Sequence, residues 1–211
     1  MPWIPAPFRI AFPAWLISST GTEPYSFKPI AKEIGKDYAL AAVAVQTSYG
    51  GIPPLTVGTA LDIQKGFEKS FKKLETYMND VVSWAPGDSP TEWGMEVPDE
   101  VWLDAATSVV KYWLGGIMSP LPPPPPGSVG TNPILFPGYL INTQTNLISV
   151  NDQLTKDISA AFKLYNALKL GKALDKAFVD HLKLVAGTWT GVILAPPAAP
   201  VPLVFPWVGL S

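Results

Sequence analysis

Proline is the residue that most restricts how this chain can fold. It occurs 24 times in 211 residues, and most copies fall in five clusters, at 2–13, 53–54, 86–98, 120–137 and 196–206. Because proline lacks a backbone N–H and its ring clashes with the preceding turn, helices are confined to the intervals between these clusters. Those intervals carry apolar residues at three- and four-residue spacing, which is typical of amphipathic helices. With no convincing succession of alternating strands, the sequence predicts a mainly α fold.

The helical body is expected to contain four to five helices. The periodic segments run at about 29–47, 57–84, 98–113, 151–170 and 172–185. Glycine and proline occur at the ends of these segments, as is usual for helix termini. The first segment contains the run ALAAVAV, which is short and apolar enough to form a strand instead.

These patterns divide the chain into five parts. They are an extended N-terminal arm (1–26), a helical unit (27–119), a proline-rich linker and loop (120–146), a helical hairpin (147–190) and an extended C-terminal arm (191–211). The run SPLPPPPPGS in the linker predicts polyproline II. A semi-rigid spacer is favoured over a ligand for SH3-like or WW-like grooves, because the nearest basic residue is Lys111.

Three predicted helix ends resemble one another: VAVQTSYGGIPP, SVVKYWLGGIMSP and KLVAGTWTGVILAPP. Each has an aromatic residue, then glycine, then proline shortly after. Glycine capping followed by proline explains much of this similarity. An internal duplication relating 57–126 to about 147–200 remains the alternative.

Composition excludes several classes of chemistry. The chain has no cysteine, so disulfides, thiolate catalysis and cysteine-ligated zinc are ruled out. Its net charge of −2 lacks the excess of basic residues that is typical of proteins that bind nucleic acids. No glycine-rich nucleotide-binding motif occurs. Only 15% of residues are charged while 47% are hydrophobic. A surface with so few charges predicts extensive burial against partners.

Catalytic and metal candidates are few. The acidic stretch GDSPTEWGMEVPDEVWLD carries no basic residue, and its acids are Asp88, Glu92, Glu96, Asp99, Glu100 and Asp104. Their spacing fits a calcium loop poorly, and a solvated loop leading into a helix explains them equally well. His181, the single histidine, shares a helical stripe with apolar residues and is expected to be a core or interface residue. We therefore expect no catalytic residues, no metal and no cofactor.

Both termini are apolar and rich in proline. The N-terminal segment lacks the basic region and continuous apolar run of a signal peptide. The C-terminal segment, uncharged from Leu184 onward, has too many prolines for a transmembrane helix. Both are predicted to be extended arms that dock into grooves of their own or neighbouring subunits. The expected partner-binding residues are Trp3, Phe8, Phe12, Trp15, Trp189, Leu203, Phe205 and Trp207.

The C-terminal region resembles a family of phage proteins. It joins an amphipathic helix with AFVDHLKLVAGTWTG to PPAAPVP, over about the last 40 residues. This pattern is similar to small structural proteins of tailed bacteriophages, of the kind found in marine and cyanobacterial myophages. The resemblance implies a non-enzymatic virion component assembled in the host cytoplasm. A place in the tail or baseplate is favoured over one in the neck or capsid. Its implied partners are other virion proteins and several copies of itself, and it carries over no functional residues.

Two other classes of function remain as alternatives. A membrane-surface protein would use the tryptophan-rich termini, although the chain lacks a basic amphipathic helix. An enzyme would need a carboxylate site in the acidic stretch between Asp88 and Asp104.

Overall fold

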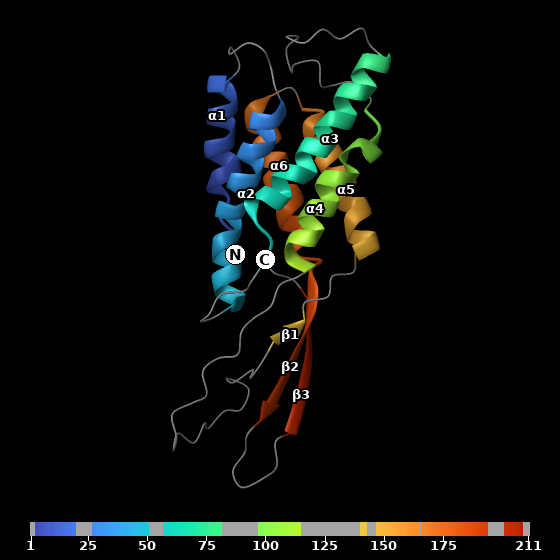
Figure 1. Ribbon diagram of the computed structural model, residues 1–211. Coiled ribbons are helices and arrows are strands. Elements are labelled where there is room, and N and C mark those ends of the chain that lie inside the picture. The colour runs from blue at the N-terminus through green and yellow to red at the C-terminus, as the bar shows by residue number, and fades with distance from the viewer. Residues whose placement is uncertain are drawn as a thin grey trace.

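The computed structural model of the chain describes residues 3–19, 27–50, 57–81, 97–114, 140–142, 147–164, 166–193 and 201–208. They form a helical bundle with a small sheet extending from one end (Figure 1). The α-helices are α1 (Phe12–Ser19), α2 (Phe27–Gly50), α3 (Ala60–Val81), α4 (Leu103–Leu114), α5 (Leu147–Phe162) and α6 (Ala167–Leu182). Two further helical turns are the π-helix η1 (Pro7–Ala11) and the 3₁₀ helix η3 (Asp99–Trp102). The mainly α prediction is confirmed.

Each periodic segment of the sequence contains a helix, with shifted boundaries. The run ALAAVAV lies inside α2, so its interpretation as a strand is wrong. The segment expected at 151–170 ends earlier, because α5 stops at Phe162 and α6 begins five residues later, after Asn166. The Asn166 side chain accepts hydrogen bonds from the backbone N–H groups of Leu168 and Lys169, at 3.0 and 3.1 Å. Such an N-cap fixes where a helix starts.

The N-terminal segment is helical, which corrects the prediction of an extended arm over 1–26. η1 runs directly into α1, and Pro7 occupies the first position of η1, where a missing N–H costs nothing. Pro13 follows the π-helical turn, in which the Phe12 N–H bonds to the Pro7 carbonyl five residues back. A widened turn is a common way for a helix to accept a residue that cannot complete the regular ladder.

One core joins the two halves of the bundle. Tyr38 of α2 lies at its centre, with ring centroids 5.3 Å from Trp3 and 4.9 Å from Phe178 of α6. The indole N–H of Trp113 donates to the Tyr38 hydroxyl at 2.7 Å. On the other side of the bundle, Trp102 of η3 stacks on Phe162 of α5 at 4.1 Å. The helical unit at 27–119 and the helices of 147–190 therefore form one body and not two domains.

The sheet has the strand order β1-β2-β3, with β1 (Leu140–Asn142), β2 (Ala186–Ile193) and β3 (Val201–Val208). β2 pairs with both neighbours in antiparallel fashion. One prediction is corrected here, because α6 ends at Leu182 and the GTWTG segment is a strand and not the end of the helical hairpin at 190. The C-terminal arm is extended over Val201–Val208, as expected, and it pairs with its own chain.

Several predictions fall outside the described residues. They include the polyproline run, most of the linker between 120 and 146, and the link between β2 and β3. The proposed duplication is weakened at its third helix end, because GTWTG belongs to β2 while the first two ends follow α2 and α4.

Candidate interaction surface

The β2–β3 hairpin brings together the C-terminal residues expected to bind partners. In its register Trp189 pairs with Phe205, Gly191 with Leu203 and Gly187 with Trp207. Positions directly opposite one another in an antiparallel ladder share a face, and successive positions alternate between the two faces. Trp189, Leu203, Phe205 and Trp207 therefore occupy positions on one face, which we call the aromatic face.

The remaining positions of the aromatic face are also apolar or glycine. Ile193 pairs with Val201 at the far end of the hairpin, and Leu140 of β1 lies opposite Trp189. The opposite face holds the alternate positions of the same strands and contains no aromatic residue; its positions are Ala186, Thr188, Thr190, Val192, Pro202, Val204, Pro206 and Val208. Neither β2 nor β3 contains a charged residue. The hairpin is thus a two-sided ribbon whose one face consists of large apolar residues and glycine.

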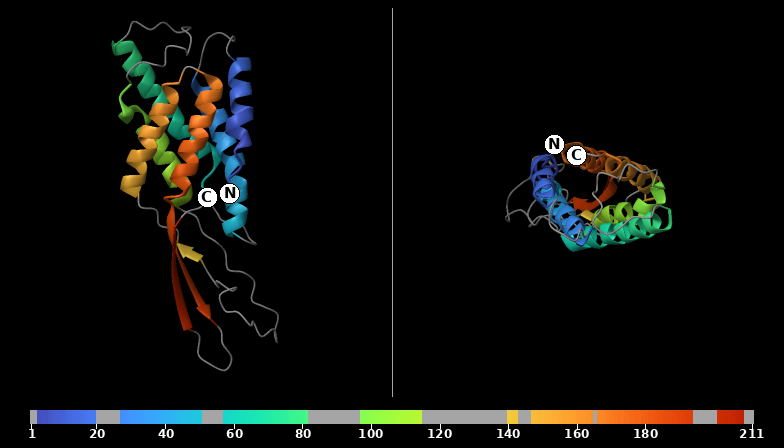
Figure 2. Two further views of the ribbon diagram at one scale, coloured as in Figure 1. Left: turned by 180° about the vertical axis from the view of Figure 1, so that it is seen from behind. Right: turned by 90° about the horizontal axis from the view of Figure 1, so that it is seen from above.

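The hairpin extends away from the helices. Figure 2 shows the strands leaving the end of the bundle where α6 stops and running along the direction of the helix axes. Only three residues, 183–185, separate α6 from β2. A short connection to a packed helix gives the base of the hairpin a fixed position on the bundle.

The N-terminal residues expected to bind partners lie elsewhere. Phe8 and Phe12 are fully buried and Trp3 is 3% exposed, all within the bundle core. Of the two alternatives expected for the N-terminal arm, these three residues therefore pack within their own subunit and not against a neighbouring one. Trp15 is half-buried and packs beside Phe12, with ring centroids 6.4 Å apart.

A buried carboxylate fixes the N-terminal segment to α6. Asp175 is fully buried, and its two oxygens accept from the Trp3 indole N–H at 2.8 Å and from Arg9 Nε at 2.6 Å. A buried charge is tolerated when it is hydrogen-bonded and paired in this way. No pattern in the sequence links residues that are more than 160 positions apart, so this contact was not predicted.

The acidic stretch shows no catalytic arrangement in its described part. Asp104 pairs with Lys73 at 2.6 Å, and Asp99 lies 3.7 Å from Lys163. Glu100 is exposed, whereas Asp88, Glu92 and Glu96 lie outside the described residues. Among the residues that the structure describes, no three histidine or acidic side chains are grouped to hold a metal ion.

His181 and Asp37 are buried in the bundle and lack the hydrogen bonds that satisfy Asp175. His181 is 2% exposed, which confirms its expected place in the core, and burial lowers its pKa to about 4. Asp37 of α2 is fully buried, and burial, with a smaller effect of the Glu33 carboxylate, raises its pKa to about 7. Neither side chain has a hydrogen-bond partner within the described parts of the chain. Both groups therefore favour their neutral forms.

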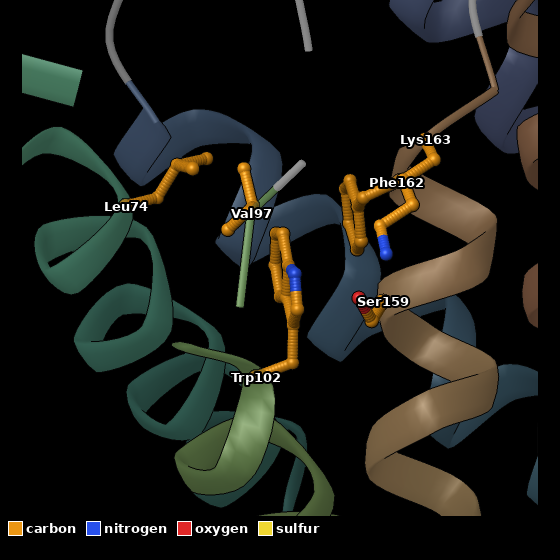
Figure 3. A pocket seen from close by; sticks show the side chains of 6 residues that line it. All are labelled: Leu74, Val97, Trp102, Ser159, Phe162 and Lys163. Carbon is orange, nitrogen blue, oxygen red and sulfur yellow. The ribbon is translucent and has the colours of Figure 1, made fainter. Parts of the chain in front are cut away.

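A small pocket lies beside the stacked pair Trp102 and Phe162 (Figure 3). The Ser159 hydroxyl and the Lys163 ammonium group line it together with apolar side chains. Its volume of about 10 Å³ is close to that needed for one water molecule. It is too small for an organic substrate.

Comparisons with protein-family models, with curated proteins and with solved structures found no match to this chain. No helix within the described residues has the length and apolar character needed to cross a bilayer.

Proposed function

We propose that this protein is a non-enzymatic structural component of a multi-subunit particle, and that it docks onto neighbouring subunits through the β2–β3 hairpin. The observation that carries the proposal is the aromatic face, which collects Trp189, Leu203, Phe205 and Trp207 on an uncharged hairpin that extends from the bundle. Tryptophan and other aromatic residues dominate the energetics of protein interfaces.

The energetics favour a docked hairpin over a free one. Each large apolar side chain that moves from water into a contact contributes about 1.5–3 kcal/mol. The helices bury aromatic residues of their own, including Phe8, Trp102 and Phe178, in contacts with other helical residues. A hairpin built in this way supplies apolar area for contact with another subunit.

The particle we propose is a tailed-phage virion, assembled in the host cytoplasm. This rests on the resemblance of the C-terminal sequence to small myophage structural proteins. Tail or baseplate is favoured over neck or capsid, and the partners would be other virion proteins and further copies of this chain. The corrected fold changes the mechanism from two docking arms to one docking hairpin, because the N-terminal segment belongs to the core.

Incorporation of two matched variants into particles tests the proposal. Phe205→Lys places a charge on the aromatic face, whereas Val204→Lys places the same charge at the adjacent position on the opposite face. Because an unpaired charge is costly to bury, we expect incorporation of Phe205→Lys to fall at least about tenfold, equivalent to about 1.4 kcal/mol. Val204→Lys should be incorporated at a level close to the unmodified chain.

Three results would contradict the proposal. Equal incorporation of Phe205→Lys and the unmodified chain would show that the aromatic face is not the docking surface. Absence of the chain from purified particles would reject the virion role. A monomer that floats with liposomes, and loses that property in Phe205→Lys, would instead support a membrane-surface function.

A further inference from the structure

β3 is the outer strand of the described sheet. The order β1-β2-β3 pairs one edge of β3 with β2, and its other edge has no partner strand among the described residues. An outer strand of this kind normally presents a row of N–H and C=O groups to which another strand can add. Whether a neighbouring subunit can extend the sheet depends on which residues of β3 face outward.

The two prolines of β3 identify the outward-facing residues. Pro202 pairs with Val192 and Pro206 with Thr188 in an unbroken ladder from Ala186–Val208 to Ile193–Val201. Along an antiparallel strand, alternate residues direct their backbone groups toward one neighbour or the other. Proline within a sheet lies where its absent N–H would face away from the partner strand. Since Pro202 and Pro206 are four residues apart, both belong to the outward-facing set, together with Val204 and Val208.

This set is short of hydrogen-bond donors. Its four residues supply four carbonyl groups but only two N–H groups, those of Val204 and Val208. A strand added at this edge would leave its own carbonyls unpaired opposite both prolines. Unpaired backbone carbonyls excluded from water are strongly unfavourable. The spacing places one proline on each side of the Val204 donor, so no stretch of the edge offers two consecutive donors.

We propose that Pro202 and Pro206 close the outer edge of β3 to strand addition, so that a second copy of this chain cannot extend the sheet there. This inference rests on the proposed function, because it specifies which edge of the docking hairpin is closed to other copies. An open strand edge can template the addition of further chains. The prolines thus prevent copies of the chain from joining edge to edge at β3.

Restoring the missing donors in the full-length chain tests this proposal. In Pro202→Thr/Pro206→Thr every outward-facing residue of β3 has an N–H. Val204→Thr is the matched control, because it adds the same side chain to the same edge without changing the number of donors. The mass of each protein is followed by analytical ultracentrifugation over a concentration series, and intermolecular sheet by infrared spectroscopy.

We expect the double variant to grow in mass with concentration and to gain the infrared band of intermolecular antiparallel sheet. The unmodified chain and Val204→Thr should reach a fixed mass without that band. A double variant that behaves like the unmodified chain would overturn the proposal. So would growth of Val204→Thr, because its donors are unchanged.

A second pair of variants tests the assignment of the edge separately. Val204→Pro removes an outward N–H and should leave the β2 amides as protected from hydrogen exchange as before, whereas Leu203→Pro removes an inward N–H and should expose them. The reverse result would overturn the assignment. These outcomes are independent of particle incorporation, so a failure of the proposed function and a failure of the closed edge can be told apart.

Discussion

At the scale of single residues, the buried side chains of His181 and Asp37 have opposite effects on how stability changes with pH. His181 has a folded-state pKa of about 4, below the usual value of 6.5, so it lowers stability as the pH falls from 6.5 towards 4. Asp37 has a folded-state pKa of about 7, above the usual value of 3.8, so it lowers stability as the pH rises from 3.8 towards 7. Between about pH 4 and 6.5 the two contributions therefore oppose each other.

Removing either group should remove its own contribution to the pH dependence of stability. In His181→Leu the free energy of unfolding should fall relative to the unmodified chain as the pH rises from 4 to 6.5. In Asp37→Asn it should rise over the same range. Each relative slope is limited to about 1.4 kcal/mol per pH unit, the value for one proton. Urea unfolding followed by tryptophan fluorescence measures both slopes, and profiles parallel to the unmodified chain would show that neither group is perturbed by burial.

At the scale of elements, the contact between α6 and the N-terminal segment depends on the absence of a side chain at Gly171. A Cβ there would run into the Phe8 carbonyl oxygen and lie 2.7 Å from Pro13 Cγ. Backbone and a proline ring cannot move aside as a flexible side chain can. The close approach brings Arg9 and Trp3 to Asp175, which lies one turn further along α6.

Gly171→Ala should therefore destabilise the protein by about 1–3 kcal/mol, as expected for overpacking. The direction of this change distinguishes a crowded site from an open one. In an uncrowded helix interior, replacing glycine by alanine raises the free energy of unfolding by about 1 kcal/mol. The neighbouring exposed residue provides the control, and Lys172→Ala should change the free energy of unfolding by less than about 0.5 kcal/mol. A stabilised Gly171→Ala in urea unfolding would contradict the close packing of the N-terminal segment on α6.

The elements that were predicted and those that were missed differ in the range of their contacts. The apolar stripes of α3 and α6 are local patterns, so the sequence indicates these helices directly. The N-terminal helix could not be predicted, because Pro7 and Pro13 suggest an extended chain. A helix accepts them here because Pro7 is at the start of η1 and Pro13 follows the π-helical turn, and the sequence does not show either position.

The hairpin was missed for a related reason. In β2 the alternation with polar residues is limited to Thr188, Trp189 and Thr190, because glycine occupies the position on either side of them. So short an alternation is a weak signal of a half-buried strand. The period-two spacing of Leu203, Phe205 and Trp207 is a signal for β3 that the neighbouring prolines obscure. The register that places these residues opposite β2 is a long-range property of the folded chain. The expected binding residues could therefore be named from sequence, but the aromatic face could not.

At the scale of the whole molecule, the described residues form a bundle with its own aromatic core and a hairpin that extends from it (Figure 1). A short connection after α6 joins the hairpin to the bundle. We propose that the aromatic face is the docking surface and that the prolines of β3 close its outer edge. The central claim is that this face, and not the bundle surface, joins the chain to the next subunit.

Photo-cross-linking in assembled particles tests that claim most directly. A photoreactive amino acid replaces Phe205 on the aromatic face in one variant and the exposed Lys172 of α6 in the other, and the cross-linked peptides are identified by mass spectrometry. We predict that position 205 forms cross-links to a different polypeptide chain and that position 172 forms far fewer. Cross-links from position 205 that remain within its own chain, at the same assembled state, would contradict the account.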